Sequence, residues 1–177
     1  MELVDVYDEN GIPTGKVIDK DRKEPLMDGE YILAVGIWIV DEENRILLTK
    51  RSMQKNWAPG KWENTAGHVK AGESCVHAIL RELREETGLE IAEEELTLLG
   101  SARSGHYFGE NYGVRVPGKR TVVTFQEGET CDAKWVEFPE FMEMGKRGEL
   151  SPSVLSHLQD YKENFLRFIG RPGDDSL

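Results

Sequence analysis

The sequence predicts a mixed α/β (α+β) fold, a sheet covered by helices, and three features of the chain indicate it. Short apolar segments rich in β-branched residues occur in both halves of the chain, as strands require. Two longer segments instead repeat apolar residues at the spacing of an amphipathic helix. Because strands and helices are interleaved, we expect a mixed central sheet with helices against it, preceded by an N-terminal β-hairpin.

The N-terminal part is read as residues 1–29, a β-hairpin and a connection packed on the main domain. The apolar residues Leu3, Val4 and Val6 precede an Asn-Gly turn signal at residues 10–11. Residues 30–170 are expected to form the main domain, and residues 171–177 a flexible tail.

The strands of the main domain are predicted from apolar runs bounded by polar or glycine-rich stretches. Residues 31–40 and 46–49 are apolar and are separated by four polar residues, which predicts a second hairpin near the middle of the fold. Five further segments follow from the same criteria: an extended segment at 62–69, strands at 96–101, 121–125 and 133–138, and a long mobile loop at 104–119.

Helices are predicted for residues 74–87 and 152–169. In the first, Cys75, Ile79 and Leu83 recur at every fourth position, and Gly88 stands where a helix C-terminus is expected. The second begins with Ser151 as N-cap and a proline at the first helical position. Its apolar stripe, or the N-terminal hairpin, is where we would expect a homodimer surface.

Composition limits the kinds of partner. The 177 residues suit one domain, and the formal net charge of −11 disfavours nucleic acid, whose binding proteins present basic faces. The first residues lack the pattern of a secretory signal, and no apolar stretch approaches the roughly 20 residues that span a bilayer. Two cysteines are too few for a disulfide framework. We therefore expect a cytoplasmic protein without a membrane partner.

Three glutamates of the first helix point to a divalent metal. Glu82, Glu85 and Glu86 are spaced so that their side chains project from one side of the helix. Taken alone, they are most simply a solvated acidic face balanced by Arg81 and Arg84. They would also repel one another unless a cation lay among them, and hard oxygen ligands suit Mg²⁺ or Mn²⁺ shared with substrate phosphates.

The residues around these glutamates decide between the two interpretations. A string of residues resembles the Nudix box at every specified position: Gly67, Glu73, Arg81, Glu82, Leu83, Glu85, Glu86, Gly88 and Leu89. The resemblance implies the α/β/α sandwich of Nudix proteins and a Mg²⁺ or Mn²⁺ cofactor. It also implies a structural role for Gly67, Glu73, Arg81 and Gly88, with an ion pair between Glu73 and Arg81.

By the same resemblance, the metal ligands are Glu82, Glu85 and Glu86, joined by the backbone carbonyl of Ala66. The implied reaction is hydrolysis of a phosphoanhydride bond by metal-activated water, in a small molecule that carries a nucleoside diphosphate linked to another group. The general base stays open between Glu82 and Glu129. The latter lies on a segment that faces the metal in some relatives, or is a surface residue of an acidic turn.

Three further residues are candidates for binding the substrate. Arg51 ends a predicted strand near the expected cleft and is suited to a phosphate. His68 follows the box glycine, and Tyr107 offers a ring on which a base can stack. The non-functional interpretations are a solvated strand end for Arg51 and a structural hydrogen-bonding role for His68.

Two other functions compete with hydrolysis. The N-terminal hairpin, the segment around Arg51 and the Gly67-His68 pair also resemble type I isopentenyl-diphosphate isomerase. That enzyme needs a cysteine just before the Gly-His pair, where this chain has Thr65-Ala66. The other competitor is a catalytically silent Nudix-fold nucleotide sensor, but such proteins usually lose box glutamates, and this chain keeps all of them.

Overall fold

The computed structural model describes residues 2–21, 25–118, 123–124 and 128–177. In this part of the chain, two sheets are present. Strands β1 (Leu3–Tyr7) and β2 (Pro13–Asp19) form the N-terminal antiparallel hairpin that the sequence predicts. The larger, mixed sheet contains β3 (Ile32–Val40), β4 (Ile46–Arg51), β5 (Trp62–Glu63), β6 (Thr65–His68), β7 (Thr97–Ser104), β8 (Tyr107–Arg115) and β9 (Thr130–Val136).

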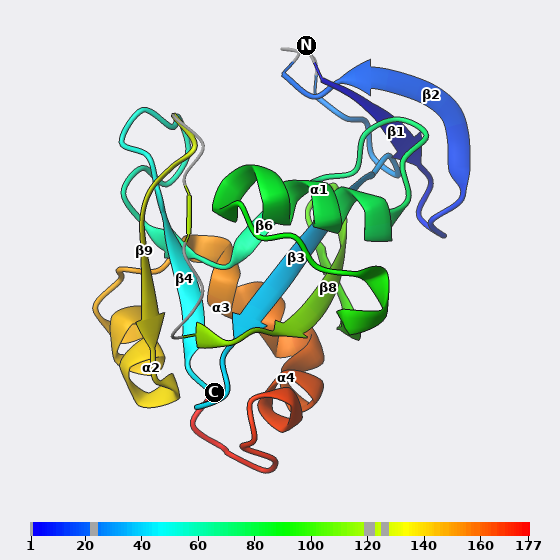
Figure 1. The fold of residues 1–177 in the computed structure, drawn as a ribbon. Coiled ribbons are helices and arrows are strands. Elements are labelled where there is room, and N and C mark those ends of the chain that lie inside the picture. Colours follow the sequence, from blue (N-terminus) through cyan, green and yellow to red (C-terminus); the bar gives the residue numbers. More distant parts are fainter. Residues whose placement is uncertain (1, 22–24, 119–122, 125–127) are drawn as a thin grey trace.

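Helices lie on both faces of this sheet, as Figure 1 shows, so the predicted α/β/α arrangement is confirmed. Helix α1 (Cys75–Thr87) covers one face, and the 3-10 turn η1 (Glu93–Glu95) follows it. The other face is covered by α2 (Phe138–Lys146), α3 (Pro152–Leu158), the 3-10 turn η3 (Gln159–Tyr161) and α4 (Lys162–Phe168). The described residues contain no helix long and apolar enough to cross a membrane.

Strand β3 forms the centre of the core because its side chains alternate between the two faces. Val35, Ile37 and Ile39 pack with α1, whereas Trp38 and Val40 pack with the helices of the opposite face. This strand exchanges partners along one edge: its first half pairs with β6, and its end pairs with β4. The candidate site lies at the point along β3 where its pairing changes from β6 to β4.

The prediction of a long mobile loop over residues 104–119 is wrong. Residues 107–115 form β8, which runs parallel to β3 over its whole length and antiparallel to β7. One of the glycines that suggested a loop, Gly113, has a packing role instead. A Cβ on Gly113 would lie 2.7 Å from the ring of Phe168, so glycine here lets α4 approach the strand closely.

The predicted C-terminal helix is interrupted. The structure divides residues 152–169 into α3, η3 and α4, and the backbone of Tyr161 leaves the helical region at the break. Tyr161 packs over Gly100 and accepts a hydrogen bond from Trp38 Nε1 at 2.9 Å, so contacts distant in the sequence fix the break. The strand predicted over residues 121–125 falls largely outside the described residues, and α2 was not predicted.

The two terminal segments contact the rest of the protein. The hairpin joins the main sheet through a bridge between Tyr7 and Tyr31, and Leu3 O accepts a hydrogen bond from Ala71 N at 2.9 Å. At the other end, Leu177 packs against the hydrophobic cluster that contains Trp38 and Phe165. The domain boundaries and the flexibility of residues 171–177 stay predictions.

Candidate active site

Helix α1 begins and ends where its sequence dictates. Ser74 caps the N-terminus by accepting a hydrogen bond from His77 N at 3.2 Å. Gly88 ends the helix in the left-handed conformation (φ 72°), which glycine adopts without strain. The strand β6, the loop after it and α1 therefore form one strand–loop–helix unit that carries every residue of the predicted box.

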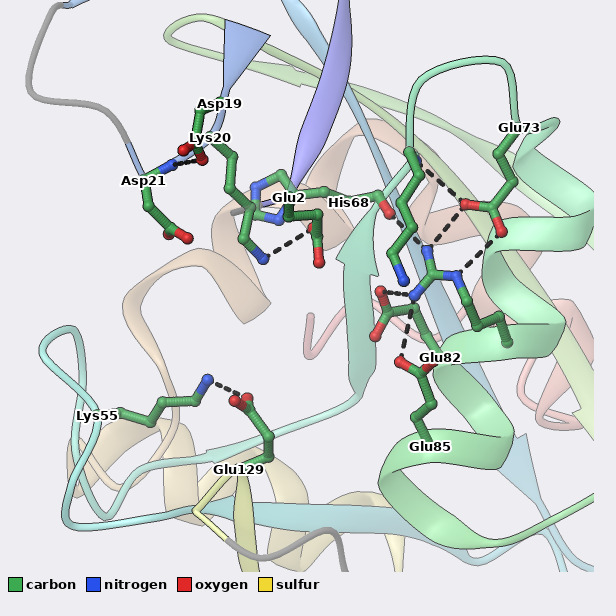
Figure 2. Close-up of polar contacts among 12 residues, drawn as sticks. Glu2, Asp19, Lys20, Asp21, Lys55, His68, Glu73, Glu82, Glu85 and Glu129 are labelled. Carbon is green, nitrogen blue, oxygen red and sulfur yellow. Dashed lines mark hydrogen bonds and ion pairs between the residues drawn. The ribbon is translucent and has the colours of Figure 1, made fainter.

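Arg81 joins the loop to the helix. Its guanidinium donates to both carboxylate oxygens of Glu73, at 3.0 and 2.9 Å, and to the backbone carbonyl of His68 at 2.9 Å. It also contacts Glu82 at 2.6 Å and Glu85 at 3.3 Å. Figure 2 shows the carboxylates of Glu73, Glu82 and Glu85 around this one guanidinium. The ion pair that the sequence predicts between Glu73 and Arg81 is present.

The glycine at position 67 makes room for a box carboxylate. An added Cβ there would lie 2.0 Å from Glu82 Cδ, too close for any other residue without displacing the carboxylate. Gly67 belongs to β6 and pairs with Val35 of β3. The close approach therefore places Glu82 directly against the edge strand of the sheet.

Glu86 lies in a region of excess negative charge. Burial, followed by the nearby carboxylates of Glu63, Glu82 and Glu129, raises its pKa well above the usual value. Burial also raises the pKa of Glu82, although Arg81 opposes the shift. Among the described residues, Glu86 makes no ion pair with any cation.

The donor set fits a hard divalent cation in its chemistry, because carboxylate oxygens predominate and the glutamate without an ion pair, Glu86, lies among them. In the part of the chain that the structure describes, however, no group of three His, Cys, Asp or Glu side chains lies close enough together to hold a metal ion. Glu82 and Glu85 are directed to Arg81 instead. Metal binding at these positions would therefore exchange part of the Arg81 contacts for metal contacts.

Glu129, the second candidate base, lies across from α1. Its carboxylate forms an ion pair with Lys55, and its backbone carbonyl accepts a hydrogen bond from Ser52 N at 2.8 Å. Figure 2 shows this pair across from Glu82 and Glu85. Because Glu129 contributes to the raised pKa of Glu86, the two carboxylates act on each other electrostatically.

A cavity of about 660 Å³ adjoins the box. All three predicted substrate residues, Arg51, His68 and Tyr107, line it, as does Ala66. Arg51 is held by Glu63 at 2.7 Å and stacks over Trp57, with its guanidinium 5.1 Å from the ring centroid. Burial, together with the charge of Lys20, lowers the pKa of His68, which favours the neutral ring.

Sequence reasoning missed several residues of the cavity wall. Asn64, between β5 and β6, and Asn111, on β8, lie on it, and both are buried polar side chains. The wrong loop assignment hid Asn111, because it gave no reason to expect that residue to be buried. His157, for which no role was predicted, also lines the cavity from α3. Nothing in the sequence could have shown this, because the packing of α3 on the sheet decides it.

Replacing Glu73 with glutamine is expected to lower both thermal stability and activity. Burial raises the pKa of Glu73, but the hydrogen bonds from Arg81 and Lys70 outweigh it, so the net shift is downward. The stabilisation is therefore present above the ordinary carboxyl pKa and lost as pH falls through the lowered one. We expect a loss of about 1–2 kcal/mol near neutral pH. Urea unfolding measures this loss of stability. An unchanged free energy of unfolding would mean that Glu73 serves the reaction and does not stabilise the fold.

Together, the fold and the site define a class of protein: an α/β/α sandwich with a carboxylate-rich helix beside a nucleotide-sized cavity. The NUDIX domain model matches residues 30–158. The chain therefore belongs to the Nudix family, whose hydrolases cleave pyrophosphate bonds and generally use divalent metal cations.

Curated relatives agree with this assignment. An uncharacterised Nudix hydrolase of Listeria monocytogenes is 30% identical over 86% of this chain and 89% of its own length. Nudix hydrolase 3 of Arabidopsis thaliana is also 30% identical over 79% of this chain, which spans only 20% of that longer protein. An isopentenyl-diphosphate Delta-isomerase of Salmonella heidelberg is 29% identical over 77% of this chain and 78% of its own length, so the isomerase-related branch is supported.

A crystal structure from Deinococcus radiodurans shares the fold, with a TM-score of 0.74 at 18% identity, covering 98% of this chain and 100% of that one. This match includes the N-terminal region that the family model leaves out.

Proposed function

We propose that the protein hydrolyses a phosphoanhydride bond in a nucleoside diphosphate linked to another group, with Mg²⁺ or Mn²⁺ as cofactor. The observation that carries the proposal is the complete set of box carboxylates, with Glu86 held among like charges and no cation paired to it among the described residues. A site that concentrates negative charge in this way requires a cation to accept an anionic substrate.

Glu82, Glu85 and Glu86 would hold the cation, together with the carbonyl of Ala66. A divalent cation there supplies positive charge that offsets the phosphates and makes the attacking water more acidic. Arg81 orients Glu82 and Glu85, and Glu73 in turn orients Arg81.

Other side chains of the cavity have roles toward the substrate. Arg51 and Lys55 provide positive charge for phosphate oxygens, each at present paired with a carboxylate. For the general base we favour Glu129 over Glu82, because Glu82 already accepts from Arg81 and lies against Gly67. Glu129 lies across from α1 and is more exposed than Glu82, and a phosphate that draws Lys55 away from it would allow it to take a proton from water.

A hydrolysis screen tests the proposal. Purified protein is incubated with ADP-ribose, nucleoside diphosphate sugars, dinucleoside polyphosphates, nucleoside triphosphates and isopentenyl diphosphate, with Mg²⁺, Mn²⁺ or EDTA. We expect a nucleoside monophosphate among the products with metal and none with EDTA. Dimethylallyl diphosphate as the only product would establish an isomerase instead, and tight nucleotide binding without turnover would establish a sensor.

A further inference from the structure

Two buried carboxamides face the cavity at one place. Asn64 follows β5 and is 9% exposed, whereas Asn111 belongs to β8 and is 7% exposed. Both line the cavity. They meet at Gly36 of β3, where an added Cβ would lie 2.7 Å from Asn111 Oδ1 and 3.1 Å from Asn64 Nδ2. The glycine therefore leaves the space that both amides occupy.

These carboxamides use little of their hydrogen-bonding capacity within the protein. Within the described residues, the side chain of Asn111 makes no hydrogen bond. In the described part of the chain, the one hydrogen bond of the Asn64 side chain is long, 3.5 Å to the backbone carbonyl of Thr65. Neither side chain contributes a fully buried atom without a partner, so the two amides reach the space of the cavity. Donors and acceptors that are open to a cavity and little used within the protein are available to a bound ligand.

Backbone pairing connects the carboxamides to the box. Gly36, which touches both amides, pairs with Ala66 of β6, and the next residue, Gly67, lies against Glu82. Gly36 and Gly67 face opposite sides of the sheet, but both line the cavity, which therefore extends from the amides to the strand beside Glu82. Tyr107 and Ala102 provide apolar wall nearby, and the cavity volume of about 660 Å³ suits a nucleotide-sized molecule.

We propose that Asn64 and Asn111 determine specificity by hydrogen bonding the uncharged heterocycle of the substrate, a nucleobase. A carboxamide presents a donor and an acceptor side by side, the arrangement that matches the edge of a base. A prenyl chain has no such groups and would leave both amides unsatisfied, so this site selects against isoprenoid diphosphates. The inference rests on the proposed function and names the substrate feature that it recognises.

Binding of nucleoside monophosphates tests the inference without any hydrolysis. AMP, GMP, CMP and UMP are titrated calorimetrically against the wild type and the variants Asn111→Leu and Asn64→Leu. We expect at least one nucleotide to bind and both variants to weaken it about tenfold or more. In turnover assays, KM should rise more than kcat falls, because the amides contact the base and not the reacting phosphate.

Thermal stability separates recognition from structure. Because each leucine removes a buried polar group without a strong partner, both variants should melt at or above the wild-type temperature. Asn164→Leu is the matched control: its carboxamide donates to Leu99 O at 2.7 Å, so its loss should lower the melting temperature and leave nucleotide affinity unchanged. A lowered melting temperature in the Asn111 and Asn64 variants with unchanged nucleotide affinity would overturn the inference.

The two proposals fail in different ways. If the wild type binds none of the four monophosphates, the inference on Asn64 and Asn111 is wrong, whatever the hydrolysis screen shows. If it binds a monophosphate through these residues but cleaves no phosphoanhydride with metal, the recognition site stands and the hydrolase proposal falls. Gly36→Ala gives an independent check, since its Cβ would displace both amides and should weaken the same nucleotide.

Discussion

Glu86→Gln is expected to reduce hydrolysis about a hundredfold or more, since a catalytic metal contributes several kcal/mol to the transition state. The neutral amide keeps the size of the side chain but weakens the site that would hold the cation. The variant should remain folded, because glutamine removes a charge that Glu63, Glu82 and Glu129 repel. The measurements are kcat/KM on the substrate found by screening and Mn²⁺ affinity by calorimetry.

The same substitution has a consequence for the pH dependence of stability. The pKa of Glu86 is raised in the folded protein, so the folded state binds its proton more tightly than the unfolded chain does. Without metal, the wild type should therefore lose stability relative to Glu86→Gln as pH rises above the ordinary carboxyl pKa, until the raised pKa is passed. Urea unfolding in EDTA between about pH 4.5 and 8 measures this difference, and added Mn²⁺ should restore the wild type alone.

Two further variants make the result specific. Glu90→Gln alters an exposed glutamate just beyond the helix and should change neither activity nor stability. Glu129→Gln should lower kcat and leave Mn²⁺ affinity unchanged, because Glu129 is proposed as the general base and not as a metal ligand. Near-normal turnover in Glu86→Gln would contradict the metal assignment, and weakened Mn²⁺ affinity in Glu129→Gln would make Glu129 a ligand.

The part of the site that could be predicted is the part fixed by local geometry. Glu73, Arg81 and Glu82 belong to one strand–loop–helix unit, and the resemblance to the Nudix box was enough to anticipate the ion pair of Glu73 with Arg81, though not the contact of Arg81 with Glu82. Strand β8 could not be anticipated in this way. Its pairing with β3 is parallel and distant in the sequence, and Gly113, which looks like a loop residue, allows the close approach of Phe168.

The errors have a common physical origin and fall next to the cavity. Asn111 was hidden by the wrong loop assignment, and the helix break at Tyr161 depends on Trp38 and Gly100. Each requires a contact between segments that only the folded sheet brings together. The box therefore predicts the chemistry, whereas the residues that select the substrate come from tertiary packing.

Arg81→Lys is expected to destabilise the protein by about 2 kcal/mol, equivalent to a melting temperature lowered by roughly 5 °C. Lysine retains the charge but cannot form the bidentate hydrogen bonds to Glu73 and, at the same time, the hydrogen bond to the carbonyl of His68. The pKa of Arg81 is raised because, although burial opposes it, hydrogen bonds from its guanidinium to Glu73 and Glu82 stabilise the charged form. Activity should also fall, since Glu82 and Glu85 lose the group that orients them.

A double-mutant cycle with Glu73→Gln shows whether this loss comes from the pair or from packing of the arginine stem. If the guanidinium acts through Glu73, adding Glu73→Gln to Arg81→Lys should lower the free energy of unfolding by no more than about a few tenths of a kcal/mol. Strictly additive losses would mean that the two residues stabilise the protein independently. The loop would then be held mainly by its other contacts, including the hydrogen bond from Gly72 N to Asp5 at 2.8 Å. In that case Asp5→Ala, and not Glu73→Gln, would release the loop and lower activity.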